Sequence, residues 1–333
     1  MARQKYFVGI DLGGTKILTT LLNRRFEVIS EKKSRIEPNR GEKQFFKTVL
    51  QDFREVLDEG KVSAKQLIAA GMGCPGIIEF PEGFVKVSPN ISFLKNCPLG
   101  ARLKSAFKIP VIVENDVNAG LYGEQQFGAA RGSRHVIGIF MGTGVGGAMI
   151  LDGSLYRGAE GAAGEIGHTF LGLPSFGETS LNAATLESRT GRLAIATEAA
   201  LLVMKQKAPK LYSAVGFDVR KIRSKALLKA IRSGDQAVRE LLLAKARLMG
   251  LAMANVVNLL NPELFVLGGG LVEAMAPVIL PEARAVMKRY ALDPLARNVK
   301  VVPARLGDYA IVLGAAKLAW DHLESRRSRG GKK

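Results

Sequence analysis

The chain has 333 residues, 47% of them hydrophobic and 23% charged, a composition typical of a globular protein with room for two domains. It contains only two cysteines, which argues against a disulfide framework and favours a cytoplasmic location. The longest uncharged stretch, residues 136–151, is short for a bilayer span and rich in glycine. We therefore expect a buried hairpin there and no membrane partner.

The net charge of +18 is the unusual feature of the composition. It would attract polyanions such as nucleic acid, polyphosphate or an acidic membrane surface. Six basic residues and no acid lie between Arg220 and Arg232, and a second basic run follows Glu324. We favour a solvated helix face and a disordered tail over a binding surface as the explanation of both runs, so charge alone assigns no partner.

The first predicted element is a hairpin, in which an apolar run at residues 7–12 is followed by a Gly/Thr turn and a second apolar run at 17–22. The pattern returns at residues 136–151 around Gly142, Thr143 and Gly144. Turns of this kind let backbone N–H groups converge on phosphate oxygens, because no Cβ blocks the approach. One hairpin per half predicts two related domains that face each other across a nucleotide-binding cleft.

Hydrophobic spacing predicts further elements in the first half, namely strands at 26–30, 67–78 and 111–113 and helices at 44–57, 99–107 and after 116. The order β-β-β-α-β-α-β-α is that of the ribonuclease H-like half-domain of actin and the hexokinases. The second half adds a loop at 156–182, strands at 264–267 and 299–302, and helices at 235–260, 271–290 and 309–323.

We therefore predict an α/β fold with two ribonuclease H-like domains around a nucleotide- and sugar-binding cleft. Residues 1–116 together with 309–333 would form the smaller domain, and residues 117–308 the larger one. The last helix would return to the smaller domain. Without a Ser/Pro-rich linker, closure would be a hinge movement between packed domains.

Asp11 stands at the mouth of the first turn, which continues as Gly13, Gly14, Thr15 and Lys16. A carboxylate there can hold Mg²⁺ through water, while the threonine and the lysine can meet phosphate oxygens. The second hairpin has Phe140 at the equivalent place, so the metal-holding role would belong to one half only.

Glycines elsewhere would let an adenosine approach the backbone. One cluster follows a predicted buried strand and consists of Gly268, Gly269 and Gly270. Small residues near the start of the last helix, beginning with Gly314, would form the other wall of the adenosine pocket. The three-glycine cluster is weak evidence alone, because glycines after strands are common in turns.

Asn115 and Asp116 directly follow a predicted buried strand. A carboxylate at a strand end can take a proton from an attacking hydroxyl, which is the general-base role in phosphoryl transfer. The alternative is an N-cap for the following helix, and both roles can coexist. A second polar set, Glu165, His168 and Glu187, offers the donors and acceptors that suit sugar hydroxyls.

Taken together, these motifs resemble the ROK family of bacterial sugar kinases, and most of all its glucokinase-like members. The motifs that carry the resemblance run from end to end: residues 11–15, 75–76, 88–90, 114–118, 142–147, 164–168, 261–263, 268–270 and 313–316. The resemblance implies Asp116 as the catalytic base. It implies a sugar site made of Asn90, Asn115, Glu165, His168 and Glu187. It implies that Asp11, Thr15, Lys16, Gly142, Thr143 and Gly144 line the phosphates.

The chain departs from the family at one place. ROK proteins commonly carry a cysteine cluster after the Gly-His segment, which binds a structural zinc together with the histidine. Residues 173–182 contain no cysteine, and one histidine cannot form a closed tetrahedral site. We therefore expect no structural zinc, and His168 would be free for the sugar.

The resulting expectation is a cytoplasmic, Mg²⁺- and ATP-dependent hexose kinase that forms a homodimer and acts on glucose in glycolysis. Another hexose or N-acetylhexosamine, such as fructose, mannose or N-acetylmannosamine, is the alternative acceptor, and polyphosphate is the alternative donor. A sugar-responsive repressor is a competing class. ROK repressors place a helix-turn-helix ahead of the kinase-like fold, whereas here the phosphate hairpin begins near Met1, so we expect no specific nucleic-acid partner.

Overall fold

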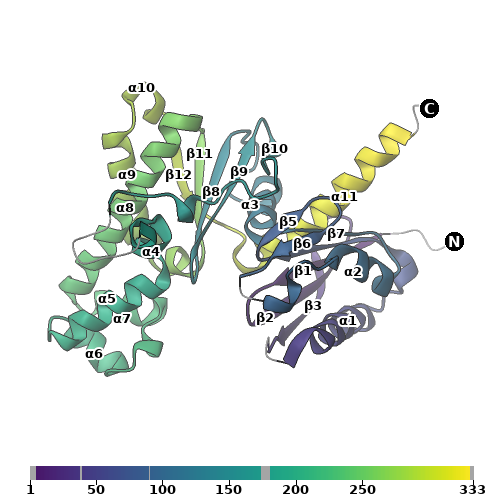
Figure 1. Ribbon diagram of the computed structural model, residues 1–333, viewed down its shortest axis with the longest axis horizontal. Coiled ribbons are helices and arrows are strands. Elements are labelled where there is room, and N and C mark those ends of the chain that lie inside the picture. Colours follow the sequence, from purple (N-terminus) through teal and green to yellow (C-terminus); the bar gives the residue numbers. More distant parts are fainter. Residues whose placement is uncertain (1–4, 38–39, 90, 174–180, 331–333) are drawn as a thin grey trace. The chain divides into compact units, whose positions relative to one another are not determined.

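The computed structural model describes residues 5–37, 40–89, 91–173 and 181–330. The chain divides into two compact units. Unit 1 comprises Met1–Gly132, Leu155–Ala163 and Asp308–Lys333, and unit 2 comprises Ser133–Ser154 and Gly164–Gly307. Each unit contains a five-stranded sheet with helices packed on it (Figure 1). The two-domain α/β fold predicted from the sequence is thus confirmed.

The sheet of unit 1 has the strand order β3-β2-β1-β4-β7. Its first three strands form an antiparallel meander, and β1, β4 and β7 run parallel. The strand bounds are β1 Tyr6–Leu12, β2 Lys16–Leu22, β3 Val28–Arg35, β4 Leu67–Cys74 and β7 Val111–Asn115. A two-stranded ribbon, β5 Ile77–Glu79 with β6 Phe84–Val87, follows β4. The helices are α1 Gly41–Glu59, α2 Leu99–Phe107, α3 Asp116–Phe127 and α11 Ala310–Gly330, with short turns η2 Ala64–Gln66 and η3 Ser92–Leu94.

The two faces of this sheet are packed differently, because side chains alternate along each strand. On one face, Val8, Ile10 and Met72 join a core with apolar residues of α1 and α2. The other face carries Gly9 and Gly71, whose missing side chains leave room for the backbone of α11. A Cβ at either glycine would collide with a carbonyl oxygen of that helix. The C-terminal helix therefore packs on the sheet of unit 1.

The sheet of unit 2 has the order β10-β9-β8-β11-β12. Its hairpin of β8 and β9 matches the predicted second copy, and β11 runs parallel to both β8 and β12. The strand bounds are β8 Val136–Met141, β9 Val145–Leu151, β10 Ser154–Leu155, β11 Leu264–Gly268 and β12 Lys300–Pro303.

The helices of unit 2 pack around one apolar core, whose largest contact is between α8 and α9. The α-helices are α4 Leu186–Thr190, α5 Arg192–Met204, α6 Pro209–Val215, α7 Ser224–Arg232, α8 Gln236–Leu260, α9 Gly270–Tyr290 and α10 Asp293–Ala296. Short 3-10 helices also belong to unit 2: η4 Ile166–His168, η5 Leu181–Ala184 and η6 Val219–Lys221. Another, η7 Gly307–Tyr309, spans the boundary between unit 2 and unit 1. In the described ranges no helix offers an apolar stretch that could cross a bilayer.

The compact units differ from the predicted division at two places. The structure assigns α3 to unit 1, where it packs against α11, although the sequence-based division began the larger domain at residue 117. Residues Leu155–Ala163 also belong to unit 1, although the segments on both sides of them belong to unit 2.

Candidate active site

The ends of three neighbouring strands in unit 1 bring two predicted site residues together. Asp11 on β1 pairs with Gly73 on β4, and Gly73 pairs with Glu114 on β7. Asp116 follows β7 as the first residue of α3. A Cβ on Gly73 would lie only 3.3 Å from Cα of Asp116. Asp11 and Asp116 therefore share the carboxyl edge of the sheet, where ligands bind in open α/β sheets.

The pKa of Asp11 is far above that of an ordinary carboxyl group. Burial raises the pKa of Asp11 to about 7, and the negative charges of Asp116 and Asp308 contribute to the same rise. Neighbouring carboxylates of this kind favour a cation, which suits the proposed contact of Asp11 with Mg²⁺. In the described part of the chain no three His, Cys, Asp or Glu side chains form a metal-binding group, so such an ion would need ligands from phosphate and water.

We expect Asp11→Asn to stabilise the ligand-free protein increasingly as the pH rises from 4 to 8. The folded-state pKa of about 7 lies above the reference value of 3.8, so the proton on Asp11 stabilises the folded state in acid. That contribution is lost as the pH rises through 7, whereas asparagine stays uncharged. The loss corresponds to at most roughly 4 kcal/mol. Thermal unfolding at several pH values measures it.

The exposed Asp58 of α1 supplies the matched control. Asp58→Asn should shift the unfolding midpoint equally at pH 4 and pH 8. If Asp11→Asn also gave a pH-independent difference, the raised pKa of Asp11 would be wrong.

Asn115 serves as the N-cap of α3. Its Oδ1 accepts hydrogen bonds from the backbone N–H groups of Val117 at 2.9 Å and Asn118 at 3.0 Å, and its Nδ2 donates to the Gly76 carbonyl at 3.0 Å. The capping role considered from the sequence is thus confirmed. This cap fixes the turn that presents Asp116, which is partly exposed. Contact of Asn115 and Asp116 with a sugar stays a prediction.

The predicted sugar residues of unit 2 come from two segments that lie side by side. Phe170 forms a β-bridge with Thr185, and the N–H of Leu186 donates to the Thr169 carbonyl at 2.9 Å. These bonds connect the end of η4 with the start of α4. Glu165 and His168 at η4 are exposed, and Glu187 on α4 is half-buried, so the structure groups the three predicted side chains in one region.

Glu187 also contacts the predicted phosphate turn. Its Oε2 accepts a hydrogen bond from the backbone N–H of Val145 at 2.8 Å. A Cβ on Gly144 would collide with the same carboxylate, so a larger residue there would require the Glu187 side chain to move. Gly142 is exposed and has open space where a Cβ would lie, while its N–H donates to the Gly144 carbonyl at 2.9 Å and closes the turn. The predicted sugar and phosphate residues of unit 2 are therefore connected by Glu187.

Arg192 was not predicted from the sequence. It is the first residue of α5, and its Nη2 donates to Oγ1 of Thr143 at 3.0 Å. Gly191 ahead of it lies against both Glu187 and Thr143, since a Cβ there would be 3.3 Å from the Thr143 carbonyl oxygen. A cation thus lies on the phosphate turn. No spacing signal in the sequence marks it, because the contact joins residues 49 positions apart.

The three glycines at 268–270 differ in their surroundings: the first two are closely packed, and the third is open to solvent. Gly268 is buried, and a Cβ there would lie 2.6 Å from the Phe140 ring. Gly269 caps α9 with a φ of 86°, which favours glycine. Gly270 is exposed, and a Cβ on it would meet no other atom within 4 Å. Of these, Gly270 offers the backbone most open to an adenosine.

Gly314 was predicted to form a wall of the adenosine pocket, but it lies buried between two helices. It is buried inside α11, and a Cβ on it would collide with the Ala119 carbonyl of α3. Gly123 on α3 makes the reciprocal close approach to Ala310. Close packing of the two helices accounts for this glycine, and its predicted contact with a nucleotide gains no support from the geometry.

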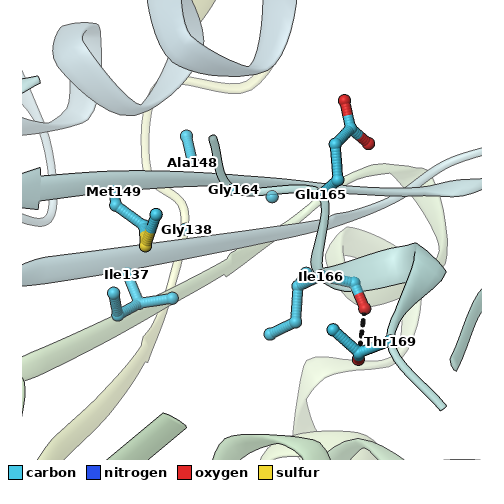
Figure 2. A pocket seen from close by; sticks show the side chains of 9 residues that line it. Ile137, Gly138, Ala148, Met149, Gly164, Glu165, Ile166 and Thr169 are labelled. Atoms are coloured by element: carbon cyan, nitrogen blue, oxygen red, sulfur yellow. Dashed lines mark hydrogen bonds between the residues drawn. The ribbon is translucent and has the colours of Figure 1, made fainter. Parts of the chain in front are cut away.

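A pocket of about 210 Å³ lies beside η4 in unit 2 (Figure 2). It is lined mainly by apolar groups and glycines: Ile137, Gly138, Gly147, Ala148, Met149, Gly164, Glu165, Ile166 and Thr169. The Glu165 carboxylate points away from the apolar side chains of Ile137 and Met149. A hexose needs many hydrogen-bond partners, so this lining does not suit one.

Two predictions fall on residues that the structure does not describe. Asn90 is one of them, and most of the loop at 173–182 is another. Cys74 and Cys97 are both buried in unit 1 as free thiols, whereas His168 belongs to unit 2. The expected absence of a structural zinc stays a prediction.

This fold and the paired carboxylates at the sheet edge define a protein of the actin/hexokinase-like class. The ROK family model matches residues 7–322, and the chain belongs to the ROK family. A glucokinase of Halalkalibacterium halodurans is 32% identical over 320 residues, which cover 94% of each chain. A xylose repressor of Caldicellulosiruptor bescii is 29% identical over 92% of this chain and 76% of the repressor.

A solved structure agrees with these relatives. The ROK family glucokinase from Streptomyces griseus, in complex with glucose and AMPPNP, superimposes with a TM-score of 0.81 at 27% identity. The match covers 95% of this chain and 99% of that one. Kinases and repressors thus both occur among the relatives. The residues of the candidate site are therefore needed to distinguish a kinase from a repressor.

Proposed function

We propose that this protein is a cytoplasmic, ATP-dependent hexose kinase that phosphorylates glucose to glucose 6-phosphate. The observation that carries the proposal is the pair Asp11 and Asp116 at the carboxyl edge of the unit 1 sheet. Sugar sensing needs no such pair, whereas phosphoryl transfer needs a base for the acceptor and a carboxylate for the cation. The glucokinase relatives support the same class.

In the proposed reaction, Asp116 accepts the proton of the sugar hydroxyl as its oxygen attacks the γ-phosphorus. Glu165, His168 and Glu187, together with Asn90 and Asn115, orient the sugar. Thr15 and Lys16 in unit 1 and the 142–144 turn in unit 2 bind the phosphates. Mg²⁺ held by Asp11 through water would neutralise phosphate charge. The two sets of residues belong to different units, and the proposal is that one reaction uses both.

We predict that Arg192→Gln raises the KM for ATP about tenfold, because a charge-assisted hydrogen bond to phosphate is worth about 1.5 kcal/mol. The sugar KM should change little. Lys229→Gln on the exposed face of α7 is the matched control for loss of one positive charge. An equal rise in KM for the two variants would show general electrostatic attraction in place of a contact by Arg192.

The proposal is tested by a coupled ADP-release assay with Mg²⁺ and ATP. The acceptors are glucose, mannose, fructose, N-acetylglucosamine and N-acetylmannosamine. In a second series polyphosphate replaces ATP, and the sugar phosphate is measured directly because this donor releases no ADP. Turnover that is fastest with glucose and ATP is the expected result. A faster alternative sugar or donor would keep the kinase class and change the substrate.

The second candidate is a sugar-responsive regulator, which the xylose repressor relatives favour. A regulator would bind sugar without releasing ADP from any acceptor in the panel. A gel shift that disappears at moderate salt would indicate only attraction of the basic chain to DNA.

A further inference from the structure

Residues Leu155–Ala163, here called the strap, begin at the last residue of β10 and belong to unit 1, and the chain returns to unit 2 at Gly164. Within unit 1 the strap is held by an ion pair of Glu160 with Lys86 at 2.6 Å. Gly161 lies against the Ile78 carbonyl, so closely that a Cβ would be 2.6 Å from its oxygen. The strap is therefore part of unit 1 by packing, although the chain on both sides of it belongs elsewhere.

Arg157 makes the most buried contact of the strap. Its Nε donates to Oε2 of Glu114 at 2.7 Å, and the side chains are 22% and 1% exposed. The guanidinium also lies 3.9 Å above the Phe80 ring. A carboxylate as buried as Glu114 is costly unless a cation and hydrogen bonds compensate it, and Arg157 supplies the charge.

The second oxygen of Glu114 reaches the turn that carries Asp116. Oε1 accepts hydrogen bonds from the Asn115 backbone N–H at 2.9 Å and from Nδ2 of Asn118 at 3.1 Å. Asn115 and Asn118 are the cap and the first turn of α3. A continuous path of hydrogen bonds thus runs from Arg157 through Glu114 to both sides of Asp116.

We infer that Arg157 is a positioning residue, which holds the Asn115–Asp116 turn in its reactive geometry by orienting the buried Glu114 carboxylate. This inference rests on the proposed function, because it assumes Asp116 as the base. Neither the ROK resemblance nor any motif pointed to Arg157. Without it, Glu114 would rotate toward another partner, and the backbone N–H of the cap residue Asn115 would lose its acceptor.

The test compares Arg157→Gln with Lys86→Gln, which breaks the other ion pair of the strap and leaves Glu114 untouched. Arg157→Gln should lower kcat about 30-fold, as expected for a displaced reacting group. The KM for ATP should stay within about twofold, because Arg157 touches no predicted phosphate ligand. Lys86→Gln should leave both constants unchanged, and Arg157→Lys should recover part of kcat.

Amide hydrogen exchange of residues 111–121 provides a readout that needs no turnover. Arg157→Gln should speed exchange in this peptide, and Lys86→Gln should not. Faster exchange with an inactive wild type would uphold the positioning role and reject the kinase proposal. Unchanged exchange in Arg157→Gln would overturn the inference, as would unchanged kcat in an active enzyme.

Arg157→Gln leaves a buried charge and could fail to fold, so Glu114→Gln and the double variant complete a cycle. The double variant removes both charges and should unfold at a higher temperature than Arg157→Gln. Its loss of kcat should be much smaller than the product of the two single losses. Losses that multiply independently would show that Arg157 does not act through Glu114, and would also overturn the inference.

Discussion

Replacing Asp116 by asparagine is expected to lower kcat about 1,000-fold, because the variant keeps the shape of the side chain and loses its ability to accept a proton. Oδ1 of Asp116 shares the Val117 N–H, at 3.0 Å, with the Asn115 cap, and the amide oxygen of an asparagine can accept the same bond, so the turn should stay in place. Sugar affinity should therefore change little. Steady-state ADP release gives kcat, and equilibrium dialysis with labelled sugar gives the affinity.

Asp152→Asn is a suitable control for Asp116→Asn, because Asp152 is an exposed residue that follows β9. It should be as active as the wild type. If Asp116→Asn kept a tenth or more of the wild-type turnover, Asp116 would not be the base. A loss of both turnover and sugar binding would instead show that the variant disturbs the sugar site.

A second large effect is expected from the paired substitutions Gly314→Ala and Gly270→Ala. Gly314 leaves no room for a Cβ between α11 and α3, whereas Gly270 is surrounded by open space. Gly314→Ala should therefore cost about 2–3 kcal/mol through overpacking, which lowers the thermal midpoint of a chain of this length by roughly 3–4 °C. Its KM for ATP, measured below the unfolding temperature, should not change.

Gly270→Ala should show the opposite pattern. Its thermal midpoint should equal that of the wild type, and its KM for ATP should rise severalfold because a methyl group meets the approaching nucleotide. A raised KM for Gly314→Ala with unchanged stability would restore the adenosine wall predicted from the sequence. Both measurements use the same preparations, so each variant is the control for the other.

The repeating elements of this fold are readable from the sequence because their signals are local. The two hairpins differ from their predicted bounds by a few residues, and the helix predicted at 99–107 has those bounds in α2. The same local logic predicted Asp11 and Asp116, since each stands where an apolar strand ends. Parallel strands then bring their ends to one edge.

Contacts between residues far apart in the chain could not be predicted from the sequence. Arg157 and Glu114 are 43 positions apart, and each alone is an ordinary charged residue. Glycine is equally ambiguous, because a backbone approached by a ligand and one approached by another helix both exclude a Cβ. The contact with α3 accounts for Gly314, whereas Gly270 has open space, where we propose that the nucleotide approaches. Only the packing of α3 against α11 separates them.

The measurement that tests the kinase proposal most directly is transfer of label from γ-labelled ATP to glucose, followed by separation of the sugar phosphate from inorganic phosphate. We predict label in glucose 6-phosphate with the wild type and almost none with Asp116→Asn. Label that stays in ATP or appears only in inorganic phosphate, across the full panel of sugars, would contradict a sugar kinase.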